Sequence, residues 1–219
     1  MMAPRKKPRL REKGEDPVRD RILGAAMRTF MEHGFAAATT LEIATRAKVS
    51  KRELYALVGN KEEMLAACVA RRGRRMRLPE GFRASVDMAS LESALRQYGL
   101  VLLKELVDPD VLAVFQLGIS ESKRSPGIAA SINEQGHKPA NAALEALLRS
   151  AHGARLLVSD DFPSMVAHYR DLLLGDRMVY VLLGTAAPPT PREIDRRADE
   201  AARLFLRLYG KGTGTVTKQ

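Results

Sequence analysis

Apolar residues recur along most of this chain at the three- and four-residue spacing of one face of an α-helix. The first such segment begins at Asp16-Pro17, an N-cap residue followed by a proline at the first helical position. Ile22, Ala26 and Phe30 follow at intervals of four residues, and Gly34 ends the pattern. The spacing predicts one amphipathic helix before Gly34.

Three helix starts follow in quick succession. At each of them, a residue that caps helix N-termini stands three places before a glutamate, the spacing of a capping box. The pairs are Thr39 with Glu42, Ser50 with Glu53, and Asn60 with Glu63. They predict short helices at about 40–47 and 51–58 and a longer helix from about 61. Only Lys48, Val49 and the cap Ser50 separate the first two. So short a connection forces a sharp crossing, and we interpret the pair as a helix-turn-helix.

The pattern stays helical downstream, and no convincing strand is visible. Gly136 and Pro139 are expected to kink or divide one of the later helices. The predicted helices cover about 86–107, 109–122, 126–150, 163–184 and 191–209. The fold class is therefore predicted to be all-α, with about nine helices: an N-terminal three-helix helix-turn-helix domain joined to a larger C-terminal helical bundle.

Positive charge is concentrated in the first third of the chain. Residues 1–80 carry 19 Lys and Arg against 10 Asp and Glu, a net of +9, whereas residues 81–219 carry 17 against 16, a net of +1. This asymmetry indicates that the first part meets a polyanion. No apolar run reaches the length of a membrane span, no secretory signal is visible, and the single Cys68 fits a reducing compartment. We expect a cytoplasmic protein that does not enter membranes.

The predicted helix at 51–58 is too short to be stable in water by itself. Leu54 and Val58 supply an inward face, which leaves Lys51, Arg52 and Tyr55 pointing outward. In a helix-turn-helix the second helix enters the major groove of DNA and presents its first residues to the base edges. Arg52 suits a bidentate contact to guanine, whereas Lys51 and the Tyr55 hydroxyl suit phosphates.

Neighbouring helix starts extend this candidate DNA surface, because free N–H groups and the helix dipole favour phosphate there. The candidate DNA-contacting residues are Thr39, Thr40, Ser50, Lys51, Arg52, Tyr55 and Lys61. The arginines of "ARRGRRMR" at 70–77 either reach phosphates as well or cover the junction between the two domains.

The stretch from about residue 18 to residue 66 resembles the DNA-binding domain of TetR-family transcriptional regulators. The matching elements are F-x3-G from Phe30 to Gly34, T-x3-I-A from Thr39 to Ala44, "VS" at 49–50, "LY" at 54–55 and "NKEEM" at 60–64. The resemblance implies an all-α dimer whose larger C-terminal domain usually binds a small molecule. Carried over by position, it implies DNA contacts by Thr39, Lys51, Tyr55 and Lys61.

The sequence departs from the family pattern at three places. Lys48 stands where the family commonly has glycine in the turn, and a left-handed backbone there costs a lysine roughly 1 kcal/mol. Leu57 and Val58 replace the usual aromatic or His-Phe pair, which removes one phosphate contact. Glu53 is acidic inside the recognition helix; we interpret it as the capping partner of Ser50, with a contact to cytosine as the alternative.

The last two predicted helices resemble, more loosely, those that pair two subunits of the family as a four-helix bundle. The candidate dimer-interface residues are Tyr180, Leu183, Ala201, Leu204, Phe205 and Leu208. The alternative is that these apolar faces close the core of their own subunit.

An apolar ligand pocket is expected in the C-terminal bundle. Its candidate residues are Tyr98, Phe115, Phe162, Met165, His168 and Tyr169. The alternative is that they are plain core, since aromatic and methionine residues at helical spacing most often are. The four histidines show no metal-ligand spacing, and no nucleotide-binding or hydrolase motif occurs. We expect no metal, no cofactor and no enzymatic activity; the rival reading as an α-helical enzyme lacks clustered catalytic residues.

These features predict four parts: a flexible basic arm at 1–15, a DNA-binding domain at 16–66, a ligand-binding and dimerisation domain at 67–210, and a flexible tail at 211–219. The predicted function is a nucleoid-associated, sequence-specific transcriptional regulator that binds double-stranded DNA as a homodimer. It acts as a repressor, released from its two-fold operator by a small apolar or amphipathic effector. The alternative is a DNA-binding dimer with no small-molecule ligand.

Overall fold

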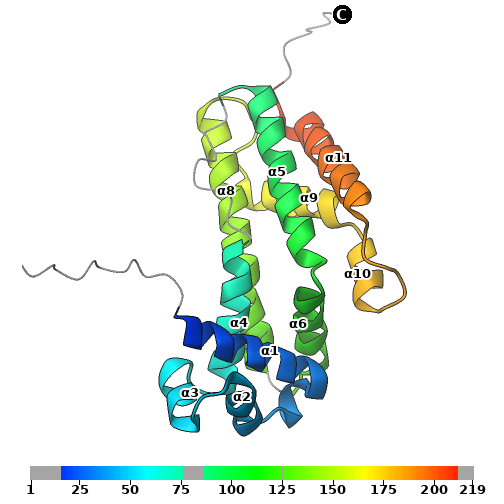
Figure 1. Ribbon diagram of the computed structural model, residues 1–219. Helices are drawn as coiled ribbons and strands as arrows, with labels where there is room; N and C mark the ends of the chain where they lie inside the picture. Colours follow the sequence, from blue (N-terminus) through cyan, green and yellow to red (C-terminus); the bar gives the residue numbers. More distant parts are fainter. Residues whose placement is uncertain (1–15, 76–85, 125, 212–219) are drawn as a thin grey trace, which may run out of the picture. The chain divides into compact units, whose positions relative to one another are not determined.

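The computed structural model describes residues 16–75, 86–124 and 126–211, and these residues are almost entirely helical (Figure 1). No strand forms within these ranges; Leu157 and Gly210 make one isolated bridge. The predicted all-α class is confirmed. The chain divides into two compact units between Met64 and Leu65, inside α4 (Lys61–Arg75). The predicted arm at 1–15, residues 212–219 of the tail and most of the "ARRGRRMR" side chains lie outside the described residues.

The first unit contains α1 (Pro17–Ala37), α2 (Thr40–Ala47), α3 (Lys51–Leu57) and the start of α4. Gly34 has non-helical backbone, with φ 75° and ψ 165°, so regular α1 geometry ends at the predicted residue. The Asn60–Glu63 pair forms both bonds of a capping box, at 2.7 and 2.8 Å. Thr39 and Ser50 cap α2 and α3. The core of this unit comprises Ile22, Leu23, Ala26, Phe30, Ile43 and Leu54, all essentially inaccessible to solvent.

The second unit is a helical bundle. α5 (Met88–Leu106) and α11 (Pro191–Tyr209) lie side by side, and α9 (Phe162–Leu174) packs against α11 (Figure 1). The remaining helices are α6 (Pro109–Ser120), α7 (Pro126–Ile132), α8 (Lys138–Gly153) and α10 (Arg177–Leu182).

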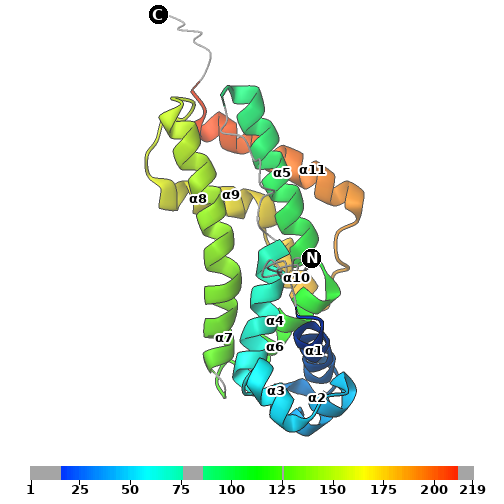
Figure 2. The same cartoon turned by 60° about the vertical axis from the view of Figure 1, so that its left-hand side comes forward.

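Two of the longer predicted helices are interrupted. The segment 126–150 forms α7 and α8 with a π-helical turn at Asn133–His137, which contains Gly136, between them, and Figure 2 shows the three as one continuous column. The single helix predicted at 163–184 is wrong. Gly175 has φ 57° and ψ −159°, a conformation that suits glycine, and it ends α9 before α10 begins.

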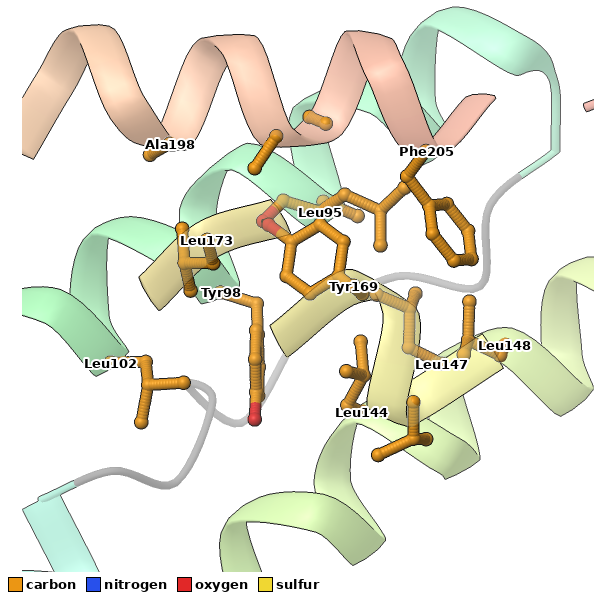
Figure 3. Packing of buried hydrophobic residues seen from close by; sticks show 14 of the residues in the cluster. Leu95, Tyr98, Leu102, Leu144, Leu147, Leu148, Tyr169, Leu173, Ala198 and Phe205 are labelled. Carbon is orange, nitrogen blue, oxygen red and sulfur yellow. The ribbon is translucent and has the colours of Figure 1, made fainter. Parts of the chain in front are cut away.

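Two buried tyrosines connect the helices of the second unit (Figure 3). The Tyr98 hydroxyl donates a hydrogen bond to the Ala140 carbonyl oxygen at 3.1 Å, and the Tyr169 hydroxyl donates to the Leu95 carbonyl oxygen at 2.6 Å. Burial raises the pKa of Tyr98 to about 12 and raises the pKa of Tyr169 further. Both phenols therefore stay protonated and remain donors at neutral pH.

Gly99 lets α5 approach its neighbours closely. A Cβ atom at this position would lie 2.8 Å from the Tyr169 hydroxyl oxygen, 3.0 Å from Leu173 Cδ1 and 3.3 Å from Ala198 Cβ. The Tyr169 oxygen has little freedom to retreat, because its ring is buried and its hydroxyl is bonded to α5. The close packing at this point of the bundle core therefore requires the absence of a side chain at Gly99.

We expect Gly99→Ala to destabilise the protein by about 1–3 kcal/mol through overpacking, although alanine favours a helix over glycine by about 1 kcal/mol. Urea denaturation followed by circular dichroism measures the change. The matched control is Gly127→Ala, because nothing lies within 4 Å of a Cβ at Gly127 in α7. The control should be neutral or slightly stabilising. Equal stability of the two variants would contradict the packing argument.

Candidate nucleic-acid interface and bundle cavity

The connection from α2 to α3 is a tight turn with a left-handed residue. Lys48 has φ 53° and ψ 48°, the backbone conformation that sequence analysis anticipated at this position. Its N–H donates to the Thr45 carbonyl oxygen at 3.1 Å, and the Val49 N–H donates to the Ala44 carbonyl oxygen at 3.0 Å. These bonds satisfy carbonyl groups at the end of α2. They also fix the direction in which the chain leaves α2 and enters α3.

One face of α3 is anchored in the first unit. Leu54 is completely buried and Val58, just after the helix, is 8% exposed. Arg21 of α1 donates from Nε to the Ala47 carbonyl oxygen at 2.7 Å, which ties α1 to the end of α2. A helix of seven residues is therefore held by its neighbours and not by its own propensity.

The opposite face of α3 presents Lys51, Arg52 and Tyr55 to solvent. The Lys51 ammonium lies 6.0 Å from the centroid of the Tyr55 ring. The Tyr55 hydroxyl lies 3.4 Å from Thr40 Oγ1, a long hydrogen bond between α3 and the first residue of α2. The structure thus brings four of the predicted DNA-contacting residues together on one exposed surface.

The hydroxyl groups of Thr39 and Ser50 cap helices and still carry a hydrogen-bond donor. Their hydroxyl oxygens accept hydrogen bonds from the N–H groups of Glu42 and Glu53, at 3.2 and 3.1 Å, and so cap α2 and α3. A hydroxyl that accepts in this way still has its own hydrogen to donate. The capping bond therefore orients the O–H group and leaves it suited to a phosphate oxygen.

Lys61 is placed differently from the expectation. Its ammonium donates to three carbonyl oxygens near the end of α1, those of Phe35, Ala36 and Ala38, at 2.6 to 3.2 Å. It also lies 4.6 Å from the centroid of the Phe35 ring. In this structure the side chain therefore caps the end of α1, and the DNA contact predicted for it stays a prediction.

Arg46 belongs to an ionic cluster between α1 and α2. Its guanidinium contacts Glu32 and lies 2.9 Å from a Glu42 oxygen, and His33 Nε2 lies 2.9 Å from that same oxygen. The hydrogen bond from Arg46 lowers the pKa of Glu32. Glu32, His33 and Glu42 lie close enough to hold a metal ion, but Arg46 already contacts both carboxylates. The periodicity of the sequence gives no signal of this cluster.

The predicted ligand residues are mostly core, so this expectation is corrected. Tyr98, Met165 and Tyr169 are at most 2% exposed and Phe162 is 8% exposed, so these four are buried within the subunit. His168 lies on the surface, where its Nδ1 bonds to the Tyr209 hydroxyl. Phe115 alone of the predicted set lines the cavity described next.

A narrow, mainly apolar cavity lies within the second unit. Its wall comes from α4 to α9 and from the π-helical turn. The lining residues are Val69, Leu102, Leu106, Val111, Val114, Phe115, Ile132, Gly136, His137, Ala140 and Arg170. Sequence analysis missed all of these except Phe115, although it noted the break at Gly136 that forms part of the wall.

The predicted dimer residues separate into two groups. Ala201 and Phe205 are completely buried in the core of their own subunit, so the expectation for these two is wrong. Tyr180, Leu183 and Leu208 are 49%, 69% and 60% exposed, and Leu204 is half-buried. α11 thus directs part of its apolar stripe into the subunit and leaves another part at the surface.

Within residues 16–75, 86–124 and 126–211, no helix combines the length and the apolar character that crossing a membrane requires.

Two protein-family models match most of the chain. The model described as "Bacterial regulatory proteins, tetR family" matches residues 22–68. The model described as "AefR-like transcriptional repressor, C-terminal domain" matches residues 93–211. No curated protein matches the sequence of this chain.

Solved structures with the same fold include several regulators. A TetR transcriptional regulator from Agrobacterium tumefaciens is 26% identical, with a TM-score of 0.76 over 90% of this chain and 96% of that one. The "Flavonoid-responsive Regulator FrrA" is 27% identical, with a TM-score of 0.71 over 89% and 97%. A TetR-family protein from Mesorhizobium loti shares the fold at 23% identity, with a TM-score of 0.74 over 89% and 98%.

We expect Lys48→Gly to raise the free energy of unfolding by up to about 1 kcal/mol, because glycine adopts the left-handed conformation without steric strain. Lys48 is exposed, so the change removes no buried contact. Chemical denaturation measures the difference. The control is Lys48→Ala, which removes the same charge but keeps a Cβ atom, and which should leave stability close to that of the wild type. A loss of stability in the glycine variant would show that the lysine side chain itself stabilises the turn.

Proposed function

The chain belongs to the TetR family of bacterial regulatory proteins and is a DNA-binding transcriptional regulator, and from this premise we propose that it is a ligand-responsive repressor. In this proposal a homodimer binds a two-fold operator through α3 of each subunit. A small apolar or amphipathic molecule then enters the bundle cavity and releases the DNA. The observation that carries the proposal is the exposed trio Lys51, Arg52 and Tyr55 on a helix anchored by Leu54.

The roles within this trio follow from the chemistry of each side chain. The planar Arg52 guanidinium matches the O6 and N7 acceptors of guanine. Lys51 supplies a point charge for phosphate, and the Tyr55 hydroxyl, held near Thr40, adds a neutral donor beside it. The hydroxyls of Thr39 and Ser50 are proposed as further phosphate donors at the starts of α2 and α3.

Dimerisation is proposed through the exposed apolar side chains of α10 and α11. Val179 and Tyr180 of α10, Leu183 just after it and Leu208 of α11 are each about half exposed or more. Apolar side chains that gather at a surface are unfavourable in water and mark interaction sites. A second copy of the chain fits the role, because a two-fold reader of DNA requires a two-fold protein.

Release by a ligand requires a difference in affinity between two conformations. A ligand shifts the population only if it binds the DNA-free conformation more tightly than the DNA-bound one. The narrow, mainly apolar cavity supports this part of the proposal, as does similarity to a regulator whose name describes it as flavonoid-responsive. The alternative function is a DNA-binding dimer without an effector. A calorimetric screen that found no binder would favour that alternative.

The first test is binding of the purified protein to DNA from upstream of its own gene, titrated at several salt concentrations against a scrambled competitor. Tight binding that resists the competitor at physiological salt is expected. Weak binding that ignores sequence and collapses with salt would leave only an electrostatic attraction to DNA.

Variants of α3 should separate sequence reading from phosphate binding. Lys51→Ala should weaken binding to all DNA sequences and reduce the salt slope by about one. Arg52→Ala should relax sequence preference at one position in a binding-site selection, since a bidentate contact to guanine contributes about 1–3 kcal/mol of discrimination. Lys123→Ala, which removes an equal charge from the second unit, is the control and should change neither property. Unaltered selectivity in Arg52→Ala would exclude Arg52 as a base-reading residue.

A charge in the apolar surface of α10 should separate the subunits. We expect Leu183→Glu to shift the protein from dimer to monomer in sedimentation velocity and to weaken operator binding, because the carboxylate would be desolvated in the interface. Ile119→Glu is the control, since Ile119 of α6 is an equally exposed apolar residue at 61%. A Leu183→Glu protein that sediments as a wild-type dimer would contradict the interface.

A further inference from the structure

The bundle cavity contains one cationic side chain among apolar neighbours. Arg170 of α9 lies half-buried in the wall, and it is the only Lys or Arg among the lining residues, which all belong to the described part of the chain. Around it the wall is formed by aliphatic side chains and Phe115. A guanidinium loses much of its hydration in such a place, which is unfavourable unless another group replaces the water.

The side chain to which Arg170 donates a hydrogen bond is neutral. Its guanidinium donates one hydrogen bond to Asn141 Oδ1 of α8. Within residues 16–75, 86–124 and 126–211, no carboxylate forms an ion pair with Arg170, whereas many other arginines of the chain contact Asp or Glu. The positive charge of Arg170 is therefore uncompensated, and most of its N–H donors have no partner in this part of the chain.

The neighbouring histidine adds no second cation. Burial, reinforced by the positive charge of Arg170, lowers the pKa of His137. The His137 ring lies 5.6 Å from the Phe115 ring, tilted against it, so it extends the aromatic wall. At neutral pH the cavity thus carries a single positive charge.

A second hollow in the same unit does not combine apolar walls with a single cation. It lies beside the break between α9 and α10 and includes Arg177, Arg197 and Glu193. There Arg177 pairs with Glu193 at 3.0 Å, and Arg197 donates from Nε to the Leu173 carbonyl oxygen at 3.1 Å. Arg177 and Arg197 thus already have partners, and the third arginine of the lining, Arg196, is exposed to solvent, so that hollow offers no comparable site for an anion.

We propose that the effector of this regulator is an organic monoanion, whose apolar body fills the cavity and whose acidic group binds Arg170. A planar guanidinium binds a carboxylate through two parallel hydrogen bonds, which a lysine or an amide does not reproduce. The aliphatic residues and Phe115 match a hydrocarbon or aromatic body in character, and the cavity, at about 30 Å³, has to widen to admit one. This inference rests on the proposed ligand-responsive function and adds the chemical class of the ligand.

Calorimetry on the full chain with matched probes tests the charge requirement. Octanoate, decanoate and 2-naphthoate are compared with the alcohols and primary amines of the same carbon skeletons. We expect the best carboxylate to bind about 10-fold or more tightly than its alcohol, since hydrogen bonds to charged groups contribute more than neutral ones. The amine should bind more weakly than the alcohol. Equal affinities for the acid and the alcohol would overturn the inference.

Variants of Arg170 test whether the preference for a carboxylate over an alcohol depends on this residue. Arg170→Met should abolish the advantage of the carboxylate over the alcohol while retaining binding of the alcohol, and Arg170→Lys should retain part of that advantage. Arg192→Met, which removes an exposed arginine of α11, should behave as the wild type. An undiminished carboxylate preference in a folded Arg170→Met protein would overturn the assignment.

Operator binding distinguishes failure of this inference from failure of the proposed function. If no carboxylate binds at millimolar concentration while the free protein binds its operator, the inference is wrong and the DNA-binding function stands. If carboxylates bind through Arg170 but operator DNA is not released, the site is real and its regulatory role is wrong. Release of operator DNA by the carboxylate and not by the alcohol is the expected result.

Discussion

The position of α3 depends on the burial of a single leucine. A helix of seven residues has too few internal hydrogen bonds to persist alone, so its geometry is imposed by Leu54 below it and by the Ser50 cap at its start. The left-handed turn at Lys48 and the bond from Arg21 to the end of α2 fix the same geometry from the other side. The three exposed side chains of α3 are thus positioned by Leu54, Lys48 and Arg21, which are not among the proposed DNA contacts, and by Ser50, which is one of them.

The helix boundaries of the first unit were largely predictable from the sequence, because residues close to each boundary determine them. Caps, a proline at the first position and Gly34 act within a few residues, so sequence spacing is enough to locate them. The partners of Lys61 in the structure were not predictable, for the opposite reason. Its partners are the carbonyl groups of Phe35, Ala36 and Ala38, more than twenty residues away, and no periodicity reveals a contact over that separation.

In the second unit, periodicity identified the helices but not the direction of each side chain. Ala201, Phe205 and Leu208 all belong to the apolar stripe of α11, yet the first two are buried and Leu208 is exposed. Tyr98 and Phe115 are both aromatic residues in predicted helices. The Tyr98 hydroxyl nevertheless reaches a backbone carbonyl in the core, whereas Phe115 lines the cavity. The packing of several helices together decides which apolar residues fill the core and which line a cavity.

The π-helical turn between α7 and α8 explains a regularity in the sequence. Ile128, Ile132, Gly136, Ala140, Leu144 and Leu148 recur at intervals of four residues. In an uninterrupted α-helix each such step rotates the side chain by about 40°, so the series would spiral away from one face. The wider turn at Asn133–His137 offsets part of this drift. Gly136, which has no side chain, falls at the point where the series passes the cavity. A Cβ atom at Gly136 would lie 3.9 Å from Val69 Cγ1, another lining residue, so a larger residue at this position would reduce the volume of the cavity while Leu144 and Leu148 kept their packing.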